Sequence, residues 1–318
     1  MLEAFTSRLA NAASSRVERR FENLFPDSRK DARENALAAM RAAGAELERE
    51  IRVRGDGRGI FLVRHPHWGA CVLKTTFSAR SADAGLSNLA IARWVASADT
   101  SIFPAVLDAT ADYTLEEFID GRPFRQWMET SFRDEPTQAF LDGLRAWSEG
   151  PTPWPSETGC LAPHEIREII RQYVMKCIGH RRFLGGFRKL GGMYDLWSDG
   201  SPVAVSLQWL IAASETVRIP RGKMCGDMGN VNLLVQHKSD RIYNIDYEFM
   251  GPGHRGFDCA YLVSSLAKLD PASDTVARLS ELAFSPEYMG SVECAEFFSV
   301  YASTLTAISR KIYRHAKR

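Results

Sequence analysis

The sequence predicts an α+β fold of two lobes: a small lobe with a five-stranded antiparallel sheet and one helix, and a larger, mainly helical lobe. Three observations predict this. Short β-prone runs separated by turn residues occupy residues 51–118. After Gly121-Arg122-Pro123 the apolar residues mostly recur with helical spacing. The chain has 318 residues, of which 45% are hydrophobic, and this suffices for one large or two modest domains.

The small lobe is predicted from five β-prone runs and one helical segment. Glycine or proline turns separate the first three runs, which therefore read as an antiparallel meander. A helical segment at about 82–97 follows the third run. The five predicted strands are Ile51–Arg54, Ile60–Arg64, Ala70–Phe77, Ala105–Ala109 and Tyr113–Phe118.

The first 50 residues are rich in Ala, Arg and Glu, which are good helix formers. A break at Pro26–Asp27 divides them into two predicted helices, with Asp27 or Ser28 as a cap for the second. The predicted organisation is an N-terminal helical extension at 1–50, a small nucleotide-binding lobe at 51–120 and a large catalytic and acceptor lobe at 121–318.

In the large lobe, helical periodicity covers four segments, whereas 218–248 reads as short strands and loops. The four predicted helical segments are 163–180, 201–217, 257–268 and 290–314.

Composition excludes several classes of protein. The net charge is +1, so no global field favours nucleic acid. Six cysteines lack any C-x-x-C pair, which argues against a zinc site or a disulfide framework. The first 25 residues contain no signal-peptide run, and Val203–Ala213 is too short to span a bilayer. We expect a cytoplasmic protein with no transmembrane segment; peripheral membrane contact is compatible with this pattern, and nothing indicates an oligomeric state.

The residues that point to chemistry lie between 225 and 248. Asp227 in Cys225-Gly226-Asp227 is followed by Asn232 and an apolar strand, and Asp246 ends a second strand. Phosphoryl transfer needs an acceptor hydroxyl held in line with the γ-phosphate and metal ions that neutralise the developing charge. Magnesium prefers carboxylate and carbonyl oxygen. A loop Asp, an amide and a carboxylate at the ends of two hairpin strands can converge on one magnesium-bound triphosphate.

This region resembles the catalytic region of the aminoglycoside phosphotransferase and choline kinase superfamily. The resemblance rests on three elements in order, and Arg255-Gly256-Phe257-Asp258 is similar to the choline and ethanolamine kinase branch. The three elements are Gly226-Asp227 with Asn232-Leu233-Leu234-Val235, Ile245-Asp246-Tyr247-Glu248, and Phe257-Asp258-Cys259-Ala260.

The resemblance implies a protein-kinase-like fold and an enzyme that uses ATP and Mg to phosphorylate a hydroxyl of a small molecule. It implies that Asp227 is the catalytic base, with Asn232 as a further catalytic residue. Asn232 and Asp246 would be the magnesium ligands. Asp258 would anchor the catalytic loop.

The resemblance extends more loosely into the small lobe. Lys74 in the third predicted strand would contact the α- and β-phosphates. Gly55 and Gly57 would form a backbone-amide cradle for phosphate, although an ordinary hairpin turn explains them almost as well. The run Glu116-Glu117-Phe118 looks like the hinge whose backbone meets the adenine edge; the alternative for its two carboxylates is that they are simply solvated.

Two positions depart from the superfamily pattern. Cys225 stands where a His is usual, and a buried Cys can fill that space. Asn88 stands where the glutamate partner of Lys74 is expected, although Asp83 would serve in another helix register. Because Asn supplies no charge, a nucleotide-binding pseudokinase or scaffold is an alternative to an active kinase.

The acceptor is less well indicated. A basic segment at 164–193 contains seven Lys and Arg residues against Glu165 and Glu168, and Arg181 and Arg182 lie near its centre. If these arginines and Glu248 line the acceptor site, an anionic sugar or lipid headgroup is favoured. If the segment is only a solvated helix face, the alternatives are a choline/ethanolamine or an aminoglycoside kinase.

Overall fold

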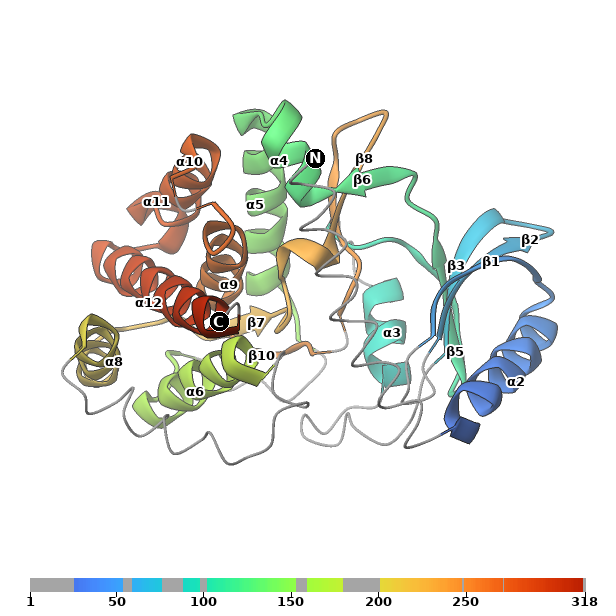
Figure 1. The fold of residues 1–318 in the computed structure, drawn as a ribbon, viewed down its shortest axis with the longest axis horizontal. Helices are drawn as coiled ribbons and strands as arrows, with labels where there is room; N and C mark the ends of the chain where they lie inside the picture. Colours follow the sequence, from blue (N-terminus) through green and yellow to red (C-terminus); the bar gives the residue numbers. More distant parts are fainter. Residues whose placement is uncertain are drawn as a thin grey trace. The chain divides into compact units, whose positions relative to one another are not determined.

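Figure 1 shows the fold in a computed structural model, in which two compact units are distinguished. The small unit comprises Met1–Asp99 with Pro104–Ile119, and the large unit comprises Thr100–Phe103 with Asp120–Arg318. The residues that the structure describes are 26–53, 59–75, 88–97, 102–152, 159–179, 201–247, 249–270 and 272–316.

Within the described residues, the small unit contains the predicted five-stranded sheet, in the order β1-β2-β3-β5-β4. Every neighbouring pair is antiparallel. Helix α3 (Asn88–Ser97) lies in the chain between β3 and β4 and packs against β4. The strands are β1 (Glu46–Val53), β2 (Gly59–His65), β3 (Gly69–Thr75), β4 (Val106–Ala109) and β5 (Tyr113–Glu117).

One face of this sheet forms the core of the small unit with helix α2 (Pro26–Ala43), which Figure 1 shows lying along the sheet. Side chains alternate between the two faces of a strand, so Phe61, Leu73 and Leu115 share the face that α2 covers. Helix α2 contributes apolar residues, two of which are alanines that allow close approach. The helix residues of this core are Ala36, Ala39 and Met40.

The start of the sheet differs from the sequence expectation. Residues up to 50 were expected to be helical, but α2 ends at Ala43 and β1 begins at Glu46. Gly44 has φ +67°, a left-handed conformation that ends helices readily. The Glu- and Arg-rich residues that follow Gly44 have high helix propensity, but the pairing of β1 with β2 outweighs this propensity.

The large unit is mainly helical, as predicted. Helix α12 packs against α6, α8 and α9. None of the helices in the described part of the chain combines the length and apolar character needed to cross a bilayer. The helices are α4 (Phe124–Ser131), α5 (Asp134–Glu149), α6 (Pro163–Gly179), α8 (Pro202–Ala213), α9 (Arg255–Ala267), α10 (Asp274–Ala283), α11 (Pro286–Met289) and α12 (Val292–Ala316).

Two small sheets hold the loops that carry the candidate chemistry. Strand β8 (Leu233–Gln236) pairs with β6 (Gly121–Pro123) and β9 (Ile242–Asn244). Strand β7 (Gly222–Met224) pairs with β10 (Gly251–Gly253). The segment after β7 and the segment after β9 are therefore both fixed at their ends by backbone pairing.

Candidate functional site

The loop that carries Asp227 joins β7 to the 3₁₀ turn η3 (Asn230–Asn232). Its tight start requires glycine, because Gly226 has φ +77° and a Cβ there would lie 2.1 Å from the backbone oxygen of Phe249. Gly226 thus lets this loop approach the segment that follows Asp246. Two separate parts of the sequence motif are brought together here.

Asp258, in the first turn of α9, anchors this loop through hydrogen bonds. Its carboxylate accepts hydrogen bonds from the backbone N–H of Cys225 at 2.6 Å and of Gly226 at 2.9 Å. The hydroxyl of Tyr173 on α6 donates to the same carboxylate at 3.0 Å. Asp258 is fully buried, so charge-assisted bonds of this kind are strong. The anchoring role predicted for Asp258 is confirmed, whereas sequence reasoning did not find Tyr173.

Asn232 ties the loop to the strand that carries Asp246. Its side-chain amide donates to the backbone oxygen of Asp227 at 2.7 Å, and its own backbone oxygen accepts from Ile245 N–H at 2.8 Å. The register Leu233↔Asn244 places Asn232 and Asp246 at the same end of the β8–β9 hairpin. Hydrogen bonds therefore join Asn232 to Asp227 and to Ile245, the residue directly before Asp246, so the three residues that the motif predicts lie in one region of the fold.

The three side chains of this cluster are of types that can serve as metal ligands. Asp227, Asn232 and Asp246 are half-buried, although most of their neighbours are buried. Among the described residues no group of three or more His, Cys, Asp or Glu could hold a metal ion. The donor set here is instead two carboxylates and an amide, which suits Mg²⁺ because Mg²⁺ is usually held by one or two carboxylates together with substrate phosphates.

The 3₁₀ turn is held against α9 by a second set of contacts. Asn230 donates its backbone N–H to the Ser265 hydroxyl at 3.0 Å and its side-chain amide to the Ser265 carbonyl at 2.9 Å. Tyr261 of α9 lies beside the same loop. Burial, followed by the charge of Asp227, raises the pKa of Tyr261 above its ordinary range, so this phenol stays protonated.

Cys225 fills the position where the sequence pattern has a His. Its thiol is fully buried, and burial, followed by the charge of Asp258, raises its pKa well above the ordinary value. It is therefore a neutral packing residue. This agrees with the expectation that a buried Cys can fill the space of the usual His.

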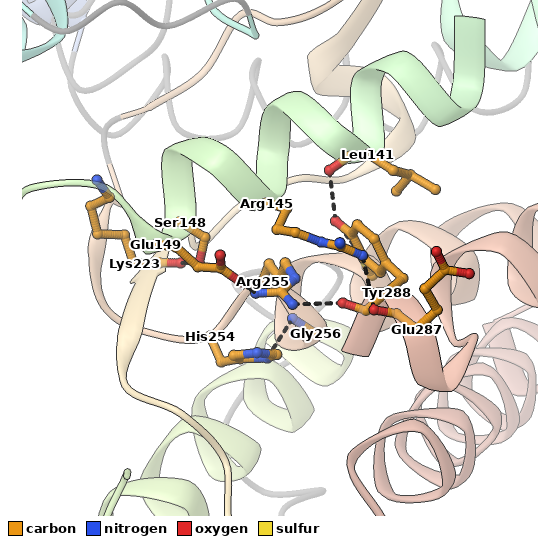
Figure 2. Close-up of polar contacts among 11 residues, drawn as sticks. Leu141, Arg145, Ser148, Glu149, Lys223, His254, Arg255, Gly256, Glu287 and Tyr288 are labelled. Carbon is orange, nitrogen blue, oxygen red and sulfur yellow. Dashed lines mark hydrogen bonds and ion pairs between the residues drawn. The ribbon is translucent and has the colours of Figure 1, made fainter. Parts of the chain in front are cut away.

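Figure 2 shows how the start of α9 is fixed. The Arg255 guanidinium is 5% exposed, donates to the Tyr288 carbonyl at 2.6 Å and pairs with Glu149 of α5 at 2.6 Å. His254 accepts from Gly256 N–H at 3.0 Å and so caps the helix. These contacts connect α9, α5 and α11, and they hold in place the helix that carries Asp258.

Two exposed apolar residues are close in sequence to the candidate catalytic residues. Val231, directly before Asn232, is 78% exposed, and Phe249 is 49% exposed. Large exposed apolar residues next to polar ones are typical of ligand-binding surfaces, although single ones are common. The sequence motif points to neither residue, because the positions that define its chemistry are polar.

In the small unit, Lys74 lies on β3 as predicted. Its ammonium is 2.7 Å from the carboxylate of Glu116 on β5, whose side chain is 2% exposed. The sequence left open that Glu116 and Glu117 are simply solvated; Glu116 is not. Glu117 and Phe118 are half-buried, and the backbone N–H of Glu117 donates to Ala105 O at 2.8 Å.

Several predicted residues lie outside the described residues. Gly55, Gly57, Glu248, Arg181 and Arg182 belong to this group, as does the side chain of Asn88.

Two arginines of the basic segment are described, and both are paired. Arg171 binds Glu168 at 2.7 Å, and Arg167 pairs with Glu215, a residue from another part of the chain. The segment itself contains only two acids, as counted, but Glu215 from elsewhere in the fold supplies a further partner.

Comparisons with known proteins bear on the fold. No family model matches the chain, and no curated protein matches it. Among solved structures, a macrolide 2'-phosphotransferase type I is 14% identical with a TM-score of 0.52, over 88% of this chain and 90% of that one. A choline/ethanolamine kinase family protein from Mesorhizobium loti is 15% identical with a TM-score of 0.51, over 85% of this chain and 81% of that one.

A third structure, an aminoglycoside phosphotransferase from Streptomyces rimosus with ADP and streptomycin, is 17% identical with a TM-score of 0.50. It matches 85% of this chain and 97% of its own. The chain has the fold of these phosphotransferases. The predicted protein-kinase-like fold is thereby confirmed. At this level of identity the likeness concerns the fold, and function must be argued from the residues.

Proposed function

We propose that the chain is a phosphotransferase that uses ATP and Mg²⁺ to phosphorylate a hydroxyl of a small molecule. The observation that carries the proposal is the cluster of Asp227, Asn232 and Asp246: Asn232 is hydrogen-bonded to Asp227 and to Ile245, and the β8–β9 register places Asp246 at the same end of the hairpin. The fold shared with three phosphotransferases supports it, and one of these was solved with ADP and streptomycin.

Each residue of the cluster has a role in this proposal. Asp227 accepts the proton of the acceptor hydroxyl, as a positioned carboxylate does in general base catalysis. Asn232 and Asp246 would hold Mg²⁺, which, when bound, neutralises charge on the transferring phosphate. Lys74 would bind phosphate oxygens of the nucleotide, and backbone groups near Glu117 and Phe118 would meet the adenine.

The acceptor is proposed only as a class. Val231 and Phe249 offer exposed apolar contacts near the proposed base, which suits an acceptor with an apolar part. An anionic acceptor would depend on Arg181 and Arg182. Because the described arginines of that segment are already paired, a choline-like or aminoglycoside-like acceptor is the alternative.

The test is phosphate transfer from ATP to a panel of hydroxylated metabolites, with and without Mg²⁺. Asp227→Asn should lower turnover by at least ~10²-fold and leave ATP affinity nearly intact, because a base acts in the transition state. Asp142→Asn, an exposed carboxylate on α5, is the control and should leave turnover unchanged. Equal turnover in both variants would refute the base assignment. Binding of Mg-ATP without transfer to any compound would favour a scaffold.

A further inference from the structure

The partner of Lys74 comes from the sheet. The Lys74 ammonium lies 2.7 Å from Oε2 of Glu116, and the two side chains are 17% and 2% exposed. The other oxygen, Oε1, accepts a hydrogen bond from the hydroxyl of Thr114 at 3.3 Å, and Thr114 is itself buried. Both oxygens of the Glu116 carboxylate therefore have defined partners, so its orientation is fixed.

Strand register explains why these side chains meet. In the antiparallel pair β3–β5, Lys74 lies opposite Thr114 and Val72 lies opposite Glu116. Positions two apart on a strand share a face, so Lys74, Thr114 and Glu116 all lie on the face opposite to that covered by α2. Lys74 and Glu116 are diagonal neighbours across the ladder, a separation that long side chains bridge.

Helix α3, which follows β3 in the chain, offers no such partner within its bounds. Helix α3 reads Asn-Leu-Ala-Ile-Ala-Arg-Trp-Val-Ala-Ser and contains no acidic residue. The resemblance predicts a carboxylate for Lys74 from this part of the chain, and Asn88 at that position supplies no charge. The strand carboxylate supplies that charge by another route.

We propose that Glu116 is the positioning residue for Lys74: it holds the ammonium in place for the phosphates of the nucleotide and substitutes for a helix-borne glutamate. This inference rests on the proposed function. Because both residues lie on paired strands, the pair does not depend on the position of a helix. The lack of an acidic residue within α3, as far as the structure describes this part of the chain, is then no sign of a pseudokinase.

Breaking the ion pair between Lys74 and Glu116 should have a large effect on nucleotide affinity. Removing one partner of a buried ion pair leaves the other charge in a poor environment, which costs more than the pair itself contributes. A hydrogen bond to a charged group is worth enough that its loss changes affinity by roughly ten- to a hundredfold. Loss of the Glu116 charge should therefore weaken nucleotide binding, because Lys74 is no longer held in place.

The first arm of the test measures Mg-ATP affinity by calorimetry. Glu116→Gln keeps the size of the side chain and an acceptor for Thr114 but removes the charge, and we expect affinity to fall by about tenfold. The control is Glu48→Gln on β1 of the same sheet, where the carboxylate pairs with the exposed Arg64. Its affinity should equal that of the wild type.

A double-mutant cycle separates positioning from a general loss of structure. If Glu116 acts through Lys74, adding Glu116→Gln to Lys74→Met should cause no further loss of affinity. Thermal unfolding should show the same coupling. Lys74→Met alone leaves a buried carboxylate without this cation, so the double variant should be more stable than Lys74→Met. Should Glu116→Gln not fold, Thr114→Val tests the same point, with an expected loss of a few-fold.

The outcomes separate the inference from the proposed function. Additive losses of affinity in the cycle, or wild-type affinity in Glu116→Gln or in a folded Thr114→Val, would overturn the positioning role while leaving a nucleotide-binding kinase intact. Unchanged affinity in Lys74→Met would remove Lys74 from the nucleotide site. A wild-type protein that does not bind Mg-ATP would overturn the proposed function and the inference together.

Discussion

Replacing Asp258 by Asn should loosen the loop that carries Asp227. The substitution keeps the shape of the side chain but exchanges one acceptor oxygen for a donor. Two of the three bonds can be retained by the remaining oxygen, which already serves Gly226 and Tyr173. The new amide then faces the Cys225 N–H that now donates at 2.6 Å.

The magnitude follows from these contacts. Loss of one bond to a charged acceptor costs about 1.5–3 kcal/mol, and the stranded buried N–H adds about 1–3 kcal/mol. We expect the free energy of unfolding of the large unit to fall by about 3–5 kcal/mol. In a unit of this size each kcal/mol lowers Tm by about 2–4 °C, so Tm should fall by about 10 °C.

Urea unfolding, monitored by tryptophan fluorescence, measures this change in the free energy of unfolding. Turnover should also fall, because Asp227 loses its fixed position. Tyr173→Phe removes only the hydroxyl bond and should cost about 1 kcal/mol. Asp134→Asn, which breaks an exposed pair with Arg278, should cost at most about 1 kcal/mol. If Asp258→Asn unfolded with the same midpoint and slope as the Asp134 control, the anchoring argument would be refuted.

Three further predictions follow from the same structure. Asp246→Ala should abolish the Mg²⁺-dependent part of ATP binding, since it removes a charged ligand; equal calorimetric affinity with and without the substitution would contradict the metal role. Gly226→Ala should lower both Tm and turnover, because its Cβ would meet a backbone oxygen at 2.1 Å, whereas Gly251→Ala, with nothing within 4 Å, should be mild; similar effects would count against the packing argument. Burial, reinforced by Arg255, lowers the pKa of His254 to about 3, while an unfolded histidine titrates near ~6.5. The unfolded state therefore binds the extra proton between these values, and stability that is full above pH ~6.5 is lost as pH falls, by roughly 2 kcal/mol at pH 5. In His254→Asn the free energy of unfolding, measured by urea titration at pH 7.5 and 5, should fall less between the two pH values than in the wild type. An equal fall would show that other groups dominate.

The order of the elements was largely predictable from the sequence. Turn residues separate the strands, and helical periodicity marks most of the large unit. The cluster of candidate site residues was predictable too, because Asn232 and Asp246 are near in sequence and flank the two strands of one hairpin. Local patterns carry such information directly.

The remaining features depend on contacts between distant parts of the chain. Residues 46–50 look helical until they are paired with β2, and the Glu116 carboxylate looks solvated until β5 is placed beside β3. Tyr173 has no motif of its own; only the packing of α6 brings its hydroxyl to Asp258. Such partners require strand order and helix packing, which periodicity alone does not supply.

The helix that covers one face of the small sheet has a practical consequence for anyone shortening the gene. A clone that begins at β1 would keep every candidate catalytic residue but would uncover the apolar side chains of Phe61, Leu73 and Leu115. An open apolar sheet face promotes aggregation. Expression clones should therefore retain α2 from Pro26 onward, and affinity tags are better fused ahead of that helix than in its place.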